Sequence, residues 1–174
     1  FLIITKIYGG LGNQLFQYAC GRAVSLRLNE ELKLDLNWFK EFPDRSFELN
    51  KFESTTINEA SHKEIMNFIQ YNKKGFFEKA LYKISGRFLK YQLPYVKEKH
   101  YHFDSELLKL SGDIYLDGYW QSNKYFIDYS NILREDLTLK IQGTSKEEKL
   151  IQKIKQIPNT VALHVRRGDF KKLK

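Results

Sequence analysis

The chain has 174 residues, of which 42% are hydrophobic and 15% aromatic, which is the composition of a folded domain and excludes a disordered chain. Its 29 basic and 21 acidic residues give a net charge of +8, which favours an anionic partner but fits a nucleotide, a nucleic acid or an anionic lipid. The single cysteine, Cys20, excludes an internal disulfide, and no apolar stretch approaches the ~20 residues that cross a bilayer.

The first part of the chain has the pattern of a strand–loop–helix–strand unit. Residues 1–8 alternate and carry β-branched side chains, which predicts a strand. Residues 9–12 read Gly-Gly-Leu-Gly and end this strand, because glycine adopts positive φ freely and lets a ligand approach the backbone. Asn13 can cap a helix over 14–28, in which Cys20 is expected to be a small buried residue and not a nucleophile. A second strand over 31–36 is expected to pair with the first in parallel.

The rest of the chain alternates helices and strands less regularly. The elements predicted from periodicity and turn residues are an irregular excursion over 37–52, helices over 58–72 and 75–90, a strand over 113–119, helices over 123–136 and 145–156, a turn at Pro158–Asn159 and a strand over 160–166. Strands that alternate with helices place the chain in the α/β class. The sequence therefore predicts a Rossmann-like parallel sheet with flanking helices.

The last predicted strand ends in a basic cluster. The apolar run 161–165 is typical of the central strand of a parallel sheet, and Arg166 and Arg167 follow it directly. Open α/β sheets bind ligands just beyond the carboxyl ends of their strands. A guanidinium held there can bind a phosphate with two hydrogen bonds and keeps its charge at any physiological pH. This cluster therefore predicts an anionic, phosphorylated ligand.

The glycine loop by itself fits several sites. A Walker loop requires Gly-Lys-Ser/Thr after its glycines, where this chain has Asn13 and Gln14. A dinucleotide fingerprint requires a third glycine where Leu15 stands, although Asp35 ends the second strand at the spacing of a ribose-binding acid. A tight turn between strand and helix, with no ligand, is the remaining interpretation of the loop alone.

Four stretches, taken in chain order, resemble one enzyme family. They are residues 9–19 (Gly-Gly-Leu-Gly-Asn-Gln-Leu-Phe-Gln-Tyr-Ala), 45–52 (Arg-Ser-Phe-Glu-Leu-Asn-Lys-Phe), 118–126 (Gly-Tyr-Trp-Gln-Ser-Asn-Lys-Tyr-Phe) and 164–169 (His-Val-Arg-Arg-Gly-Asp). Together they resemble the α-1,2-fucosyltransferase family, glycosyltransferase family 11, whose members run well beyond the arginine motif. The resemblance implies the first part of a two-domain GT-B-like enzyme. Residues 1–158 would form a Rossmann-like acceptor-side domain, and residues 159–174 would begin a GDP-sugar-binding domain.

The resemblance implies an inverting, metal-independent transfer of L-fucose from GDP-fucose to the 2-hydroxyl of a galactose-containing glycan. The sequence has no HExxH, Asp-x-Asp or clustered Cys/His set, so no metal site or other cofactor is expected. Arg166 is then the expected catalytic residue, since a fixed donor aimed at the developing charge of the leaving diphosphate contributes ~3 kcal/mol or more. In an extended strand His164 shares a face with Arg166, while Arg167 points the other way.

The expected site residues fall into two groups. The donor-binding residues are Gly10, Gly12, Asn13, His164, Arg166, Arg167 and Asp169. The acceptor-binding residues are Tyr119, Trp120 and Gln121, since aromatic faces and amides suit sugars. Structural roles remain open for several of them: a cap for Asn13, a core position for His164 or Trp120, an acid partner for Arg167 and a helix cap for Asp169. The sequence singles out no carboxylate as general base.

Two other functions are weighed against this one. A pI of about 9.4 and many tyrosines suit a nucleic-acid-binding protein, but the lysines are dispersed and no RNP, KH or helix-turn-helix phrase occurs. A dinucleotide-dependent oxidoreductase is disfavoured by Leu15. The expected partners are GDP-fucose and a glycan, and not nucleic acid. The expected location is the cytoplasm of a bacterium, or the inner face of its membrane, because the start at Phe1 lacks the features of a signal peptide. Residues 1–174 alone are expected to have no measurable transferase activity.

Overall fold

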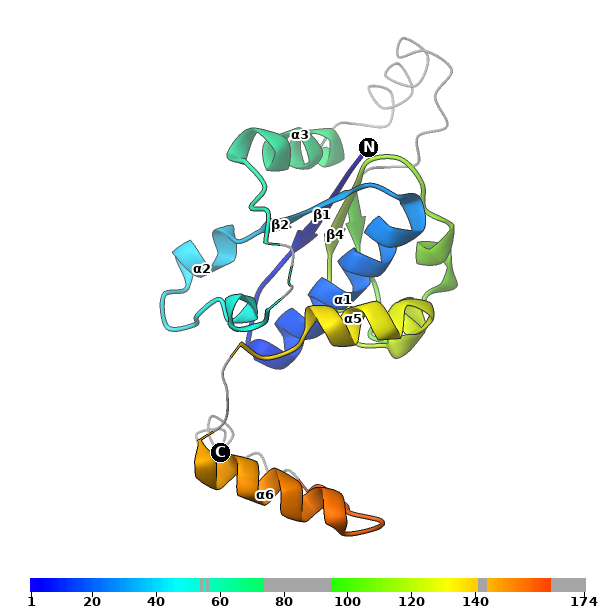
Figure 1. The fold of residues 1–174 in the computed structure, drawn as a ribbon. Helices are drawn as coiled ribbons and strands as arrows, with labels where there is room; N and C mark the ends of the chain where they lie inside the picture. Colours follow the sequence, from blue (N-terminus) through cyan, green and yellow to red (C-terminus); the bar gives the residue numbers. More distant parts are fainter. Residues whose placement is uncertain (54, 56, 74–94, 141–143, 164–174) are drawn as a thin grey trace, which may run out of the picture. The chain divides into compact units, whose positions relative to one another are not determined.

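A parallel sheet organises the first of two units into which the chain divides, Phe1–Lys140 and Ile141–Lys174. The structure, a computed structural model, describes all residues except 54, 56, 74–94, 141–143 and 164–174 (Figure 1). The strands of this sheet are β1 (Leu2–Lys6), β2 (Glu31–Asp35), β3 (Tyr95–Lys97) and β4 (Ile114–Asp117). Their order is β2-β1-β4-β3 and all neighbours are parallel, which confirms the predicted α/β class.

The central strand is β1, which has partners on both sides. Ile3 lies opposite Leu32 of β2 and opposite Ile114 of β4. A strand paired on both edges and covered on both faces is apolar along its length, which explains the run Leu-Ile-Ile at its start. The strands predicted over 1–8, 31–36 and 113–119 are confirmed, whereas β3 was not predicted.

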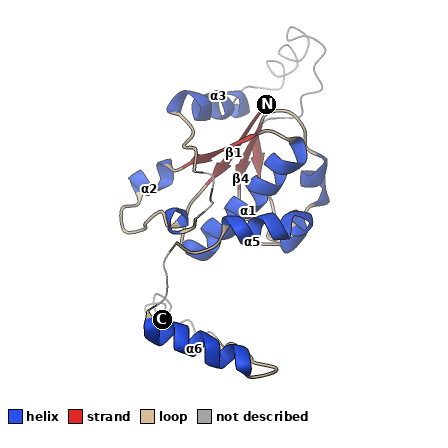
Figure 2. Cartoon of the chain, in the orientation of Figure 1, coloured by secondary structure: helices blue, strands red, loops and turns tan. Residues whose placement is uncertain are grey.

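Helices of the first unit cover both faces of this sheet (Figure 2). Among the described residues its α-helices are α1 (Leu11–Leu28), α2 (Asn37–Glu41), α3 (His62–Lys73) and α5 (Ser130–Asp136), while α6 (Ser145–Gln156) belongs to the second unit. Single 3-10 turns are η1 (Leu49–Lys51), η2 (Ser105–Lys109), η3 (Asn123–Tyr125) and η4 (Ile127–Tyr129). The helix predicted over 123–136 is therefore broken into η3, η4 and α5, and the excursion over 37–52 contains α2 and η1. The helix predicted over 75–90 lies outside the described residues.

The two faces of the sheet bury separate apolar clusters. On one face, Ile3, Leu32 and Leu116 pack with residues of α1 and with Leu133 of α5. On the other face, Ile4 and Tyr115 pack with Ile65 and Phe68 of α3. Figure 1 shows α1 and α5 on one side of the strands and α3 on the other. This alternation along β1 is the period-two pattern of a strand between two helical layers.

Polar side-chain contacts fix α1 against its neighbours. Asp136 of α5 accepts hydrogen bonds from the Tyr18 hydroxyl and the Arg22 guanidinium, both at 2.9 Å and on the same carboxylate oxygen. Near the other end of α1, the Arg27 guanidinium donates to the backbone carbonyls of Leu108 and Leu110. These contacts hold the helix that carries the glycine loop in one position on the sheet.

The start of α1 differs from the prediction. The helix begins at Leu11, its N-cap is Gly10, and no side chain caps it. Asn13 lies in the first turn and is not the cap, because the tight turn at Gly9 (φ +79°) lets the helix start immediately after the strand. The predicted capping role of Asn13 is therefore wrong, which leaves its side chain amide available for other contacts.

The second unit contains α6, described here by itself. Thr144 and Glu147 form a reciprocal capping box, and the chain turns at Pro158–Asn159, as predicted. The strand predicted over 160–166 is not present in its described part, since residues 160–163 are irregular, with Val161 92% and Leu163 88% exposed. A strand needs a hydrogen-bonding neighbour, and none of the described residues pairs with 160–163. Within the described part of the chain, no helix is long and apolar enough to span a membrane.

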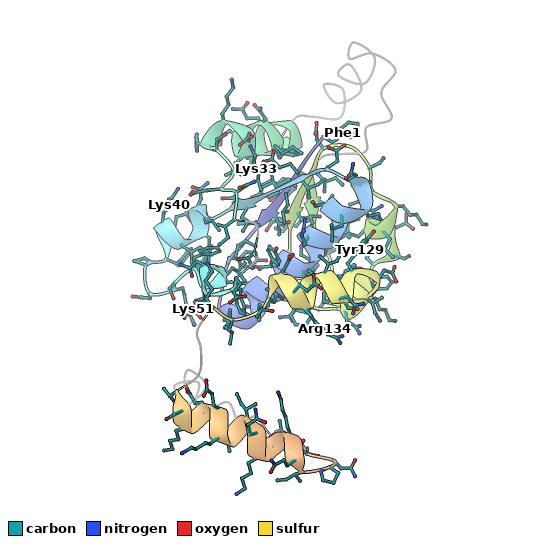
Figure 3. The ribbon with its side chains drawn as sticks, in the orientation of Figure 1. Phe1, Lys33, Lys40, Lys51, Tyr129 and Arg134 are labelled. Carbon is teal, nitrogen blue, oxygen red and sulfur yellow. The ribbon has the colours of Figure 1, made fainter. Side chains whose placement is uncertain are left out.

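An ion pair between β2 and α3 is expected to make folding stability depend on pH. Lys33 reaches up to α3 (Figure 3), where its ammonium lies 2.6 Å from the Glu64 carboxylate. Hydrogen bonds from Lys33 and Ser61 lower the pKa of Glu64 from 4.5 to about 2. Because the pKa is lowered by folding, the stabilisation is present above about pH 4.5 and is lost as the pH falls towards 2.

The Glu64→Gln variant should therefore show a flatter dependence of the unfolding free energy on pH between these two values, measured by denaturant titration. Glu59→Gln is the matched control, because its partner Lys40 is 68% exposed and such pairs contribute little. Equal pH dependence in wild type and Glu64→Gln would contradict the assigned role of the pair.

Candidate functional site

The candidate site lies at the carboxyl edge of the sheet, where β1 and β4 are neighbours. The chain leaves β1 towards β2 on one side, while β4 occupies the other side, so the strand order changes direction at this point. Ligands of open α/β sheets bind at such a position, just beyond the carboxyl ends of the strands. Here the segments that follow the two strands are residues 7–13 and residues 118–122.

The glycine loop after β1 leaves its backbone accessible. A side chain at Gly9 would be strained by the φ of +79° and would place its Cβ 2.7 Å from the Asn13 amide nitrogen, which would have to move. At Gly10 and Gly12 the corresponding position is open space. A ligand can therefore approach the backbone at the two glycines assigned to the donor, and their role in donor binding stays a prediction.

A hydrogen bond joins the predicted donor-binding segment to the predicted acceptor-binding segment. The Gln121 amide donates to the Asn13 carboxamide oxygen at 2.8 Å, across 108 positions of sequence. The two residues come from opposite sides of the point where the strand order changes direction. The structure thus brings Asn13 and Gln121 together, and leaves the Asn13 amide nitrogen on the side of Gly9.

Gln14 joins the glycine loop to the segment over 45–52. Its amide nitrogen donates to the carbonyls of Gly9 (3.0 Å) and Ser46 (2.9 Å), and its oxygen accepts from the Glu48 backbone N–H (2.9 Å). The side chain is fully buried. Gln17, also fully buried, accepts from the Tyr8 backbone N–H at 3.0 Å. These two roles were not predicted from the sequence, although two glutamines on the buried side of an apolar helix were a visible signal.

Glu98 fixes the segment after β4. Its carboxylate accepts hydrogen bonds from the backbone N–H groups of Tyr119 (2.7 Å) and Trp120 (3.2 Å). Trp120 has φ +55°, a left-handed conformation that is uncommon for a large side chain. A Cβ at Gly118 would lie 2.4 Å from the Glu98 Cβ and 2.8 Å from the indole of Trp120. Glycine at position 118 is therefore required for Glu98 to reach the backbone N–H groups of Tyr119 and Trp120.

The residues assigned to the acceptor occupy different environments. Trp120 is 2% exposed and packs edge-on against Tyr125, with ring centroids 5.7 Å apart. Its indole is part of the core, which is the structural alternative considered for it from the sequence. Tyr119 and Gln121 lie nearer the surface, where Tyr119 lines a cavity. Contact of these residues with a sugar stays a prediction.

A cavity of about 240 Å³ opens at the ends of β1, β3 and β4. Its lining residues are Tyr8, Lys97, Glu98, Lys99, His100, Tyr101, Asp117, Gly118 and Tyr119. The ring centroid of Tyr119 lies 4.8 Å from that of Tyr8 and 6.4 Å from that of Tyr101. These three tyrosines form a continuous aromatic wall. Such a wall offers apolar faces to the C–H groups of a ligand and hydroxyls at its edges.

Asp117, the last residue of β4, interacts through both of its carboxylate oxygens with residues around this cavity. One carboxylate oxygen accepts a 2.5 Å hydrogen bond from the Tyr95 hydroxyl, and the other lies 3.7 Å from the Lys6 ammonium. Burial and then the Asp117 charge raise the pKa of Tyr8 well above its ordinary value. Burial and the hydrogen bond to Asp117 also raise the pKa of Tyr95 well above its ordinary value. Both phenols therefore stay neutral at physiological pH and can donate hydrogen bonds.

Two residues that the sequence analysis considered for chemistry have structural partners. Asp35 is 4% exposed and accepts hydrogen bonds from the Tyr115 hydroxyl (2.6 Å) and the Asn37 backbone N–H (3.0 Å). It is therefore not placed to bind a ribose, which removes the one feature that favoured a dinucleotide site. Cys20 is fully buried, and burial raises the pKa of its thiol, as expected for a core residue and not for a nucleophile.

Metal-binding side chains do not gather in the described part of the chain, where no three His, Cys, Asp or Glu residues are placed to hold one ion. His100 and His102 stack with ring centroids 5.0 Å apart. The predicted residues of the arginine motif, His164, Arg166, Arg167 and Asp169, lie outside the described residues, and their roles stay predictions.

Comparison with known proteins identifies relatives of the chain. The sequence model described as glycosyl transferase family 11 matches residues 2–173. An alpha-1,2-colitosyltransferase from Escherichia coli is 31% identical over 172 residues, which cover 97% of this chain and 55% of that protein. The chain thus spans about half the length of this relative. No solved structure matches the chain.

Proposed function

The chain belongs to glycosyltransferase family 11, and from this premise we propose that the protein carrying it transfers L-fucose from GDP-fucose to the 2-hydroxyl of a galactose-type acceptor, with inversion. The observation that carries the proposal is the arrangement of three family-like segments at one edge of the sheet. The Asn13–Gln121 bond joins the first segment to the third, and Gln14 joins the first to the second.

This edge has the features that a nucleotide-sugar donor requires. The glycine loop leads into the first turn of α1, where free backbone N–H groups and the helix dipole favour a phosphate. Gly10 and Gly12 leave space for the donor to reach that backbone, and Asn13 offers an amide beside them. In the proposed GT-B-like enzyme, this chain contributes the acceptor-side domain and the first residues of the donor-side domain.

The proposed mechanism uses no metal ion and assigns charge neutralisation to Arg166. Negative charge grows on the diphosphate as the bond between sugar and oxygen breaks. A guanidinium held in position beside the diphosphate stabilises that charge without reorganising, which is how positioned donors lower such barriers. His164, Arg167 and Asp169 complete the proposed contacts to the donor.

The sugar that is transferred has a second candidate. The similar Escherichia coli protein is an alpha-1,2-colitosyltransferase, so colitose is the alternative donor sugar for this chain. Colitose is L-fucose without its 3-hydroxyl. A site that hydrogen-bonds this hydroxyl would reject the deoxy sugar strongly, whereas a site that leaves it free would accept both.

An assay of the full-length protein tests the proposal. The protein is incubated with GDP-fucose or GDP-colitose and a panel of β-galactosides, with and without EDTA, and GDP release and product linkage are measured. The expected result is a 2-linked product that is unaffected by EDTA. Titrations with GDP, NAD(H) and a mixed oligonucleotide should give binding with GDP alone. Turnover that depends on a metal, or binding of NAD(H) in place of GDP, would contradict the proposal.

A further inference from the structure

The cavity beside the tyrosine wall contains one carboxylate that its protein partners leave partly free. Glu98 accepts a backbone hydrogen bond on each of its oxygens, from Tyr119 and Trp120, so both oxygens are engaged in holding the loop. Asp117 accepts from Tyr95 on Oδ2 only. Its Oδ1 lies 3.7 Å from the Lys6 ammonium, beyond hydrogen-bond distance, and accepts no hydrogen bond from any residue in the described part of the chain. Asp117 is therefore the acid of this lining that presents an oxygen without a hydrogen bond from the described residues.

The size and lining of the cavity suit a single sugar ring. Its volume of about 240 Å³ is below the ~300–1,000 Å³ of clefts that hold drug-sized ligands. The rings of Tyr8, Tyr101 and Tyr119 offer apolar faces, while Lys97 and Lys99 offer donors at an exposed rim. A pyranose presents this combination of C–H faces and hydroxyl edges.

We propose that this cavity binds the acceptor sugar and that Asp117 is the general base that removes the proton from the attacking hydroxyl. The inference rests on the proposed transferase function and deepens it. In the reaction, the acceptor O–H bond breaks and its proton passes to Asp117 Oδ1. The acceptor oxygen forms a bond to the anomeric carbon of the donor. The bond from that carbon to the β-phosphate oxygen breaks, and its electron pair leaves with GDP.

The surroundings of Asp117 suit this role. The Lys6 ammonium stabilises the ionised carboxylate, and Tyr95 holds Oδ2 so that Oδ1 is the oxygen left for substrate. The Asp117 side chain is 13% exposed, so a sugar in the cavity can reach it while bulk water has little access. Lys97 of β3 lies opposite Asp117 in the sheet register, and the phenols of Tyr8, after β1, and of Tyr115, on its own strand, also lie close enough to interact with its charge. Glu98 and His100 are further titratable groups in the lining of the same cavity. General-base catalysis of this kind typically contributes ~10²–10⁴-fold to the rate.

Asp117→Asn in the full-length protein is the first test, because it keeps the shape of the side chain and removes its basicity. We expect kcat for transfer to fall by about 10²–10⁴-fold, with GDP affinity and thermal unfolding close to wild type. Asp35→Asn is the matched control, since Asp35 also ends a strand and accepts from a tyrosine hydroxyl but does not line the cavity. It should retain near wild-type turnover. Wild-type kcat in Asp117→Asn would overturn the inference.

Tyr95→Phe is the second test and remains decisive if Asp117→Asn fails to fold. Removing the phenol removes a hydrogen bond to the ionised form of Asp117, so the acidic limb of the kcat/KM profile should move to higher pH. A purely structural aspartate would leave that limb in place, and an unmoved limb would therefore overturn the inference.

Failure of the proposed function and failure of the base assignment give different results. If the wild-type enzyme transfers no sugar from a GDP-linked donor, the proposed function is wrong. If it transfers sugar and either Asp117→Asn or Tyr95→Phe behaves as wild type, only the assignment of the base and its cavity is wrong.

Discussion

Arg166→Ala in the full-length protein is expected to lower kcat by about 10²–10³-fold while the fold and the KM for acceptor are retained. The guanidinium neutralises charge that develops on the departing diphosphate. Its removal therefore raises the free energy of the transition state more than that of the bound donor. Arg166→Lys keeps one positive charge but loses the planar pair of donors, and should remain strongly impaired. Steady-state kinetics of GDP release with saturating acceptor measures both effects.

Arg167→Ala is the matched control, since the sequence predicts that the adjacent residues 166 and 167 point in opposite directions if the chain is extended there. Its loss should weaken GDP binding, or leave it unchanged, with little effect on kcat. A variant Arg166→Ala that turns over like wild type would refute the assignment, and so would an Arg167→Ala variant with the greater loss of kcat.

Gly21→Ala is expected to lower the free energy of unfolding by about 1–3 kcal/mol. At Gly21 helix α1 packs tightly against β1, and an alanine Cβ there would lie 1.9 Å from Thr5 Oγ1 and 2.9 Å from Thr5 Cβ. Rotation of the Thr5 side chain can move the hydroxyl, but its Cβ is fixed by the strand backbone. The clash should outweigh the ~1 kcal/mol that alanine gains over glycine in a helix.

Gly12→Ala provides the control in the same helix. No atom lies within 4 Å of the position of an added Cβ, so no clash opposes the higher helix propensity of alanine. The free energy of unfolding should therefore rise by up to about 1 kcal/mol. Denaturant unfolding can be followed by the fluorescence of Trp38 and Trp120, both of which lie in the first unit. Equal stability changes in the two variants would contradict the close approach at Gly21.

The sequence predicted those elements whose signals are local. The unit of β1, α1 and β2 follows from β-branched residues, glycines and helical periodicity within 35 residues, and α6 follows from its own periodicity and the turn at Pro158–Asn159. The edge strand β3 has only three residues, too few for alternation to be visible. Residues 160–163 are apolar enough for a strand, but a strand forms only where another strand offers hydrogen bonds, which no local pattern reveals.

The site was also predicted only where its signals are local. The positions of the glycine loop and of residues 118–126 could be identified from their sequence, and their resemblance to one family was confirmed by its match to residues 2–173. The contacts that join these segments could not be predicted from the sequence. Gln14 contacts Ser46 and Glu48, and Asn13 contacts Gln121, only once the chain is folded. Asp117 and Glu98 were missed because two acids among many have no distinguishing pattern until the strands bring them to one cavity.

The side chains that join the three segments are carboxamides, and this has a consequence for the enzyme in solution. Asn13, Gln14 and Gln121 do not ionise between strongly acid and strongly alkaline conditions, and neutral hydrogen bonds are hardly screened by ions. The three junctions between these segments should therefore be indifferent to acidity and ionic strength. A response of turnover to these conditions would then report ionisable groups, such as Glu98 beside Tyr119 or the reacting groups themselves, and not the loss of these junctions.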